Sequence, residues 1–146
     1  MENQTQITPI VGNEFAQIAM QAILSAQNSI KIIVFDWRWY PSDPASVCQQ
    51  FNNELVKASR RGVQVAAVVN SQSIKDTLTS LGISVKKAKE RPLLHTKIMI
   101  IDDAHVIIGS HNYSQNAFTM NFEFSVLIEN CPQIERYLAY FNNIFN

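Results

Sequence analysis

Hydrophobic positions recur along this chain with two different spacings, and each spacing predicts one kind of element. Segments in which they recur every three to four residues predict amphipathic helices, whereas short runs of β-branched and aromatic residues predict strands. Helices are expected over residues 13–27, 43–62, 71–82 and 132–144. Strands are expected over residues 29–37, 63–69, 83–85, 98–101, 106–108 and 122–128, with a loop or a turn of helix around residues 114–118.

The order of these elements predicts the fold class. In the first half of the chain helices alternate with strands, which is typical of parallel strands joined by crossover helices. In the second half strands follow one another closely, which requires antiparallel pairing. The chain of 146 residues is therefore expected to be one domain, residues 1–146, of the α/β class, with a mixed parallel/antiparallel β-sheet flanked by helices on both faces.

The strands expected at residues 98–101 and 106–108 are separated only by the sequence Asp-Asp-Ala-His, which predicts a β-hairpin. A connection of two or of four residues would pair Ile101 with Val106. A connection of three residues would shift the register by one, and a shift of one turns every side chain to the other face.

Counting outward from the Ile101–Val106 pair places Lys97 opposite Ser110 and His95 opposite Asn112. Opposed residues and residues two apart share a face of the sheet, so these four side chains would form one polar square. The square combines an imidazole that can act as nucleophile or acid/base, a cation, and two neutral donors. That combination fits a site for an oxyanion such as phosphate.

The same alternation assigns other polar residues of the hairpin to the opposite face. Asp102 falls there, at the turn, where aspartate commonly bonds to nearby backbone, so a structural role is favoured for it. His105 and His111 also fall there and are separated by roughly 20 Å along the strand, too far to hold one ion together. No other spacing of His, Cys, Asp or Glu predicts a metal site, and no cofactor is expected.

Composition and charge exclude several classes of protein. The net charge is zero and the pI is about 6.8, which argues against a wholly basic nucleic-acid binder but leaves local basic patches open. Cys48 and Cys131 show no metal or redox spacing and are expected to be free thiols. No apolar run is long enough to cross a membrane and the first residues are polar, so a cytoplasmic location without stable membrane association is expected.

The spacing of the polar residues resembles the HKD signature of the phospholipase D superfamily, most closely that of its short, single-motif bacterial endonucleases. The matching residues are His95, Lys97, Asp102, Gly109, Ser110 and Asn112, followed eleven residues later by Glu123. The resemblance implies a phospholipase D-like fold with one HKD motif. It also implies metal-independent catalysis through a phosphohistidine on His95, with Glu123 as the acid that orients the imidazole and Asn121 as a weaker candidate of the same kind.

The resemblance also implies an assembly. Phosphohistidine chemistry needs a second histidine to protonate the leaving group, and this chain carries one copy of the motif. Short family members form a two-fold dimer in which two motifs face one another. We therefore expect a homodimer with one composite site, which suits a self-complementary surface.

Two further stretches could hold substrate. Residues 86–91 carry several cations, Lys87 and Arg91 among them, and lead directly into the motif; they are either a solvated loop or a contact for backbone phosphates. Trp39 follows the first central strand and could stack on a base, as could Tyr40, or pack against the neighbouring helix instead.

These observations favour a metal-independent phosphodiesterase, a nuclease that hydrolyses DNA or RNA. Two alternatives stay open at this point. One is a phospholipase D-like enzyme that acts on lipid phosphodiesters, which is weakened by the absence of an amphipathic membrane segment. The other is a catalytically silent module that binds nucleic acid through the same phosphate-binding residues.

Overall fold

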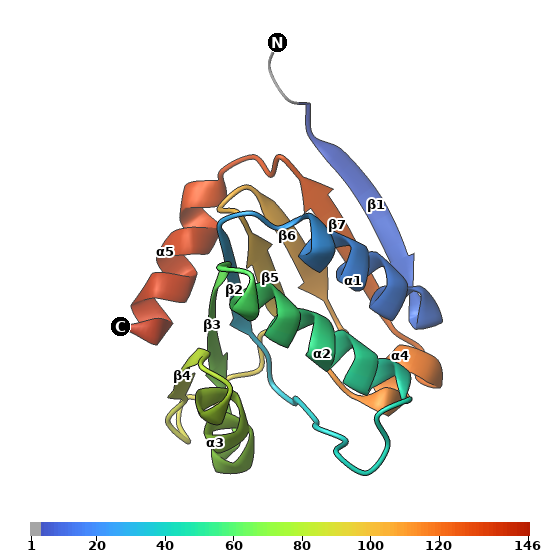
Figure 1. Cartoon of the computed structure of the whole chain (residues 1–146). Helices are drawn as coiled ribbons and strands as arrows, with labels where there is room; N and C mark the ends of the chain where they lie inside the picture. The colour runs from blue at the N-terminus through green and yellow to red at the C-terminus, as the bar shows by residue number, and fades with distance from the viewer. Residues whose placement is uncertain (1–3) are drawn as a thin grey trace.

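A computed structural model describes residues 4–146, and the core of the fold is a seven-stranded sheet in the order β1-β7-β6-β5-β2-β3-β4 (Figure 1). The β2–β3 and β3–β4 pairs are parallel and the remaining pairs are antiparallel, which confirms the predicted mixed sheet. The strands are β1 (Gln6–Val11), β2 (Ser29–Ile33), β3 (Gln64–Val69), β4 (Ser84–Lys87), β5 (Ile98–Ile101), β6 (His105–Gly109) and β7 (Phe124–Glu129). The helices are η1 (Gly12–Glu14), α1 (Phe15–Ser25), α2 (Val47–Arg60), α3 (Gln72–Ser80), α4 (Gln115–Thr119) and α5 (Ile134–Phe145).

Helices cover both faces of the sheet, as expected. Figure 1 shows α1 and α2 crossing in front of the strands, and with α3 and α4 they share the larger apolar core. The other face packs against α5 in a smaller core around Ile33, Ile100 and Phe141. Because strand residues alternate between the faces, Met99 belongs to the first core and Ile98 and Ile100 to the second.

Serine residues begin three of the helices. The side chains of Ser46, Ser71 and Ser114 accept hydrogen bonds from backbone N–H groups in the first turns of α2, α3 and α4. These bonds satisfy donors that have no partner inside the helix. Gly62 and Gly82 follow α2 and α3 with φ of 102° and 85°, a conformation that favours glycine.

The first strand, β1, has no counterpart among the predicted elements. It is an edge strand that pairs antiparallel with β7, from Gln6 opposite Glu129 to Val11 opposite Phe124. Its sequence contains Pro9, which weakens any strand pattern and which a sheet tolerates only at an edge or a bulge. Pro9 concealed a strand that gains its stability from pairing with β7.

The hairpin register differs by one residue from the predicted register. Ile101 pairs with His105 rather than with Val106, because the connection has three residues. The paired part of the hairpin ends at Ile98 and Ile108, so all four residues of the polar square lie beyond it. The prediction that strand pairing itself aligns the square is therefore wrong, and the loops at the sheet edge must position these side chains.

The side chain of Asp102 explains the three-residue turn. Asp102 and Asp103 have φ of 55° and 50°, which aspartate tolerates better than most residues. The Asp102 carboxylate accepts hydrogen bonds of 2.7–3.1 Å from the backbone N–H groups of Gln27, Asn28 and Ser29. The turn is thus docked on the loop between α1 and β2, a long-range contact that the local sequence pattern does not reveal.

The structure shows the state of the two cysteines and the lengths of the helices. Cys48 and Cys131 are both free and buried, as expected. Within residues 4–146, none of the helices has the length and apolar content that crossing a bilayer requires.

Candidate active site

One edge of the sheet gathers the loops that carry the candidate residues. The parallel strands β2 and β3 end there, and β5 begins there because it runs antiparallel to β2. β6 ends and β7 begins at the same edge. Sheets of this class bind ligands beyond the carboxyl ends of their parallel strands. The segments that meet at this edge are residues 34–46, 70–71, 88–97, 110–114 and 120–123.

His95 and Lys97 lie together in front of an aromatic ring. Lys97 Nζ is 3.2 Å from Nδ1 of His95 and donates a 3.0 Å hydrogen bond to the His95 carbonyl oxygen. The Phe35 ring lies 4.8 Å from the His95 ring and 5.5 Å from Lys97 Nζ, measured to ring centroids. An ammonium group only donates, so this contact requires a ring nitrogen with an available lone pair, which a nucleophilic imidazole also needs.

Glu123 is fixed by two hydrogen bonds on the same edge. Ser110 Oγ donates to one carboxylate oxygen at 2.5 Å and Asn121 Nδ2 donates to the other at 3.1 Å. The backbone N–H of Phe124 donates to Ser110 Oγ at 3.0 Å and so holds the hydroxyl in place. Within the part of the chain that the structure describes, the hydrogen bonds of the Glu123 carboxylate go to Ser110 and Asn121 and not to His95.

Glu123 and Lys97 are also linked electrostatically. Burial lowers the pKa of Lys97, and the nearby Glu123 carboxylate opposes that shift. Asn112 joins the other side of the site, because its Oδ1 accepts a 3.1 Å hydrogen bond from the N–H of Asp36, next to Phe35. With its oxygen engaged, Asn112 presents its NH₂ group as a donor, which suits an oxyanion.

The remaining two motif positions make structural contacts. Burial alone would raise the pKa of Asp102, but the three backbone N–H bonds outweigh it and the pKa is lowered. Gly109 faces Ser125 on β7 so closely that an added Cβ would lie 2.3 Å from the Ser125 Cα. These contacts support a structural role for both residues.

The other two histidines lie away from this edge or inside the core. His111 is buried and stacks on Phe15 at 4.4 Å between ring centroids. Its Nε2 donates to the Gly12 carbonyl at 2.8 Å, its Nδ1 lies 2.7 Å from Ser125 Oγ, and burial lowers the pKa of the ring. His105 begins β6 at the opposite end of the sheet and accepts from the N–H of Asn130. Neither imidazole is therefore placed to protonate a leaving group beside His95.

Asn70 is a site residue that the sequence analysis missed. Its Nδ2 donates to the carbonyl oxygens of Phe35 and Leu94, at 3.0 and 2.9 Å. It therefore joins the loop that carries Phe35 to the residue directly before His95. The signal in the sequence was a lone polar residue directly after the buried run of β3, at the carboxyl end of a parallel strand.

Three exposed apolar side chains beside Glu123 were also missed. Met120, Phe122 and Phe124 have exposed fractions of 78%, 108% and 56%. They lie on either side of the carboxylate, in the short segment that leads into β7. Large apolar groups clustered in this way usually mark a surface that another molecule covers.

The three possible substrate contacts occupy different environments. Arg91 lines a cavity of about 350 Å³ together with Leu94, the residue before His95. Lys87, on β4, does not line that cavity. Trp39 is half-buried and packs against the larger core, as does Tyr40, and Tyr40 Oη accepts a 2.7 Å bond from the N–H of Gln115.

The described side chains do not form a cluster suited to a metal ion. Among residues 4–146, no group of three or more His, Cys, Asp or Glu side chains is close enough to hold an ion. The Lys97 ammonium and the Asn112 NH₂ group favour an anion at this edge.

Comparison with known proteins adds the relatives of this chain. The model of the family described as cardiolipin synthase, PLD-like domain, matches residues 19–145. Phospholipase D Y of Dictyostelium discoideum is 35% identical over 91 residues, which is 55% of this chain and 21% of that protein. A 5'-3' exonuclease, PLD3, of Xenopus laevis is 27% identical over 128 residues, 77% of this chain and 26% of that protein. The chain thus spans about a quarter of the length of these two relatives.

A solved structure matches almost the entire chain. Nuc from Salmonella typhimurium, described as a phospholipase D family member, superposes with a TM-score of 0.84 at 25% sequence identity. The match covers 98% of this chain and 95% of Nuc, so the two chains share their whole fold.

Proposed function

This chain belongs to the phospholipase D superfamily, and on that premise we propose that it is a nuclease that hydrolyses phosphodiester bonds of DNA or RNA without a metal ion. The observation that carries the proposal is the His95–Lys97 pair at the sheet edge, with Nζ 3.2 Å from Nδ1. Asn112 lies on a loop of the same edge with its NH₂ group available, so a phosphate bound there would meet a nucleophile, a cation and a neutral donor together, while Glu123 holds the Ser110 hydroxyl.

The proposed reaction has two steps. A nitrogen of His95 bonds to phosphorus while the ester P–O bond breaks, and the leaving oxygen takes a proton from a second imidazole. Water then attacks phosphorus, gives its proton to that second imidazole, and the P–N bond breaks. Lys97 and the Asn112 amide stabilise the charge on the phosphate oxygens in both steps. Glu123 accepts the hydrogen bond of Ser110, and its charge opposes the lowering of the Lys97 pKa that burial causes.

The second imidazole comes from a second copy of the chain. His105 and His111 are the other histidines of the sequence, and their contacts place both away from the site. Met120 and Phe122 present apolar surface beside the incomplete site, and a second copy would cover it. A two-fold axis there would bring His95 of each protomer to one phosphate, which makes the homodimer part of the proposed mechanism.

A lipid phosphodiesterase is the second candidate, and one observation favours it. The exposed Phe122 and Met120 beside the site could contact acyl chains as well as a second protomer. The names of the relatives support both readings, because one is a phospholipase D and the other an exonuclease.

One substrate panel separates these possibilities. The protein is incubated with single-stranded DNA, duplex DNA, RNA and phosphatidylcholine vesicles, each with excess EDTA, and His95→Ala is run in parallel. Cleavage of a nucleic acid that survives EDTA and disappears in His95→Ala supports the nuclease. Release of choline without nucleic-acid cleavage would move the proposal to lipid. Binding of nucleic acid without turnover would indicate the catalytically silent module. Complete loss of activity with EDTA, restored by a divalent ion, would refute the metal-independent mechanism.

A further inference from the structure

The zero net charge of the chain conceals a strong separation of charge. Nine of the twelve Lys and Arg residues lie between positions 57 and 97, but only two of the twelve Asp and Glu residues do. This segment forms the end of α2, then β3, α3, β4 and the loop that leads to His95. One half of the sheet is therefore basic, and the candidate active site lies at its border.

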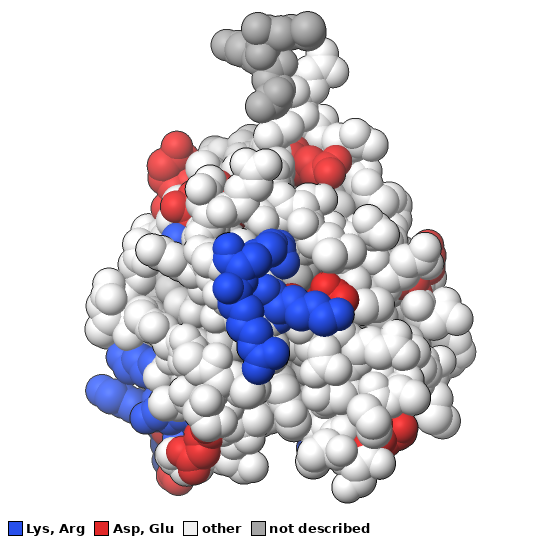
Figure 2. Space-filling model, in the orientation of Figure 1, with Lys and Arg blue, Asp and Glu red and all other residues white. Residues whose placement is uncertain are grey.

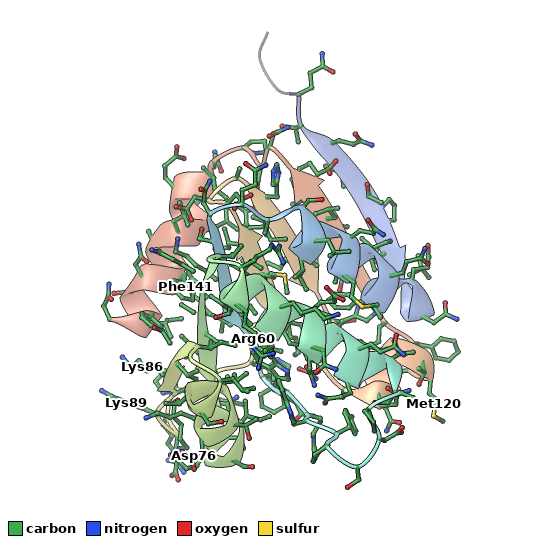
Figure 3. The ribbon with its side chains drawn as sticks, in the orientation of Figure 1. Arg60, Asp76, Lys86, Lys89, Met120 and Phe141 are labelled. Carbon is green, nitrogen blue, oxygen red and sulfur yellow. The ribbon has the colours of Figure 1, made fainter. Side chains whose placement is uncertain are left out.

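The basic side chains gather in two groups on one face of the molecule. Figure 2 shows one group in the centre and another beside the lower left edge. In the same orientation Figure 3 labels Arg60 near the centre and Lys86 and Lys89 at the lower left, next to α3 and β4. Met120 lies on the opposite side in that view, away from Lys86 and Lys89.

The second group of cations lines a built groove, the 350 Å³ cavity between the loop after β4 and helix α5. Lys86, Lys89 and Arg91 line one wall, and no acidic side chain lines the cavity. Lys86 Nζ donates to the main-chain oxygen of Asn146 at 3.0 Å, which leaves two of its three donors for another acceptor. We call this cavity the α5 groove.

Helix α5 supplies an aromatic wall to the α5 groove. Tyr140 lines it and is 44% exposed, and its hydroxyl is 2.7 Å from Oγ1 of Thr96. Thr96 stands between His95 and Lys97 in the sequence, and Leu94 lines the groove as well. The groove therefore runs from the basic half of the protein to the residues that carry the nucleophile.

We propose that the α5 groove binds the strand of single-stranded nucleic acid that flanks the scissile phosphate. This inference rests on the proposed nuclease function and deepens it by naming the strand form. The three cations contact backbone phosphates, which a single lipid headgroup does not supply in series. Tyr140 stacks on an unpaired base, a contact that every base can make once it is out of a duplex.

Strand β4 supplies a matched control for the groove. Lys86 and Lys87 are consecutive, so their side chains point to opposite faces, and of the two only Lys86 lines the cavity. Lys87→Ala therefore removes one positive charge, half the charge that Lys89→Ala and Arg91→Ala together remove, from the same neighbourhood without touching the groove. The test variants are Lys89→Ala/Arg91→Ala together, and Tyr140→Leu.

The test measures binding and hydrolysis separately, in EDTA. Binding is followed by fluorescence anisotropy with a labelled 15-nucleotide oligothymidylate, with its duplex, and with phosphatidylglycerol vesicles. Hydrolysis of bis(p-nitrophenyl) phosphate, which is too small to reach the groove, reports the active site alone. Circular dichroism confirms that each variant is folded.

The double variant should weaken binding of the single strand by about tenfold and reduce the slope of log K against log salt by about 1.4, at about 0.7 for each phosphate contact. Tyr140→Leu should weaken single-strand binding by about fivefold, in the range for loss of one stacked base, and should change duplex binding less. Lys87→Ala should bind as wild type does, and all three variants should hydrolyse the small diester at the wild-type rate.

The possible failures are distinct. If the wild type binds the strand through the groove but hydrolyses nothing, the groove stands and the nuclease proposal fails. If the small diester is cleaved but the double variant binds the strand as tightly as wild type, the groove proposal is overturned. An equal loss in Lys87→Ala would overturn it as well, because the effect would then be one of general charge. Loss of vesicle binding with strand binding intact would overturn it in favour of a lipid surface.

Discussion

The two adjacent aspartates of the β5–β6 turn allow a sharp test of which one supports the fold. Asp102 accepts hydrogen bonds from three consecutive backbone N–H groups, at residues 27–29. Asp103 makes an ion pair with Lys31. Both residues have positive φ, 55° and 50°, so replacement by Ala imposes a similar backbone penalty at either position. The difference between Asp102→Ala and Asp103→Ala therefore reports the side-chain contacts.

The expected magnitude follows from the kind and the exposure of these contacts. A hydrogen bond to a charged group stabilises a fold by about 1.5–3 kcal/mol when it is buried. Most of the Asp102 bonds are exposed to solvent, so we expect about 1 kcal/mol for each and about 2–3 kcal/mol in total. The exposed pair of Asp103 should contribute about 0–1 kcal/mol.

Urea denaturation followed by circular dichroism measures the free energy of unfolding of both variants, and heating followed in the same way measures their Tm. Asp102→Ala should lose about 2 kcal/mol more than Asp103→Ala, which is about 4–8 °C in Tm for a chain of this size. The activity of each variant, normalised to the folded fraction, should match that of the wild type. The structural assignment of Asp102 fails if Asp102→Ala is as stable as Asp103→Ala yet is as inactive as His95→Ala.

Three further predictions concern the nucleophile, the assembly and the core. His95→Ala should abolish turnover but keep the dimer and nucleic-acid binding, as measured by gel filtration and anisotropy, because Lys97 remains; residual turnover above a few per cent would contradict the assigned role. In gel filtration the wild type should elute at twice the 16.6 kDa chain mass, and Phe122→Ser should elute at the chain mass and be inactive. A fully active Phe122→Ser monomer would exclude the composite site. Burial lowers the pKa of His111, so the folded state binds fewer protons than the unfolded state, and the free energy of unfolding should fall as the pH drops below about 6.5. In His111→Phe this dependence of the free energy of unfolding on pH should become weaker. An unchanged dependence would assign the effect to another titratable group.

The sequence carried enough information for the fold because its strong patterns are local. The central strands and the long helices show clear periodicity, and they appear in the structure within a few residues of the predicted bounds. β1 escaped prediction because it contains Pro9 and gains its stability from β7, more than a hundred residues away. Pairing between distant segments leaves little trace in a local pattern.

The register of the β5–β6 hairpin also depends on a contact with a distant segment, which the local pattern does not reveal. Turn chemistry alone allowed connections of two, three or four residues between β5 and β6. The choice was made by the contacts of Asp102 with residues 27–29, which no hairpin rule includes. The motif spacing nevertheless selected four residues that meet at one edge, His95, Lys97, Ser110 and Asn112, because strand order brings their loops together whatever the register.

The sequence pattern did not predict that Asn70, Phe122 and Tyr140 lie beside the candidate site. Each becomes informative only beside another segment: Asn70 through its bonds to two loops, Phe122 through its exposure beside Glu123, and Tyr140 through the groove it shares with Arg91. Their roles come from tertiary placement, whereas the motif residues could be selected by spacing alone.

The most direct measurement is a search for the covalent intermediate on His95. The protein is mixed with a slowly hydrolysed single-stranded oligonucleotide in EDTA, denatured under alkaline conditions that preserve a P–N bond, digested, and mapped by mass spectrometry. We predict a nucleotide adduct on His95 that forms during turnover, decays as product accumulates, and is absent from His95→Ala. Steady turnover without any adduct, or an adduct on Ser110 or His111 instead, would contradict the mechanism.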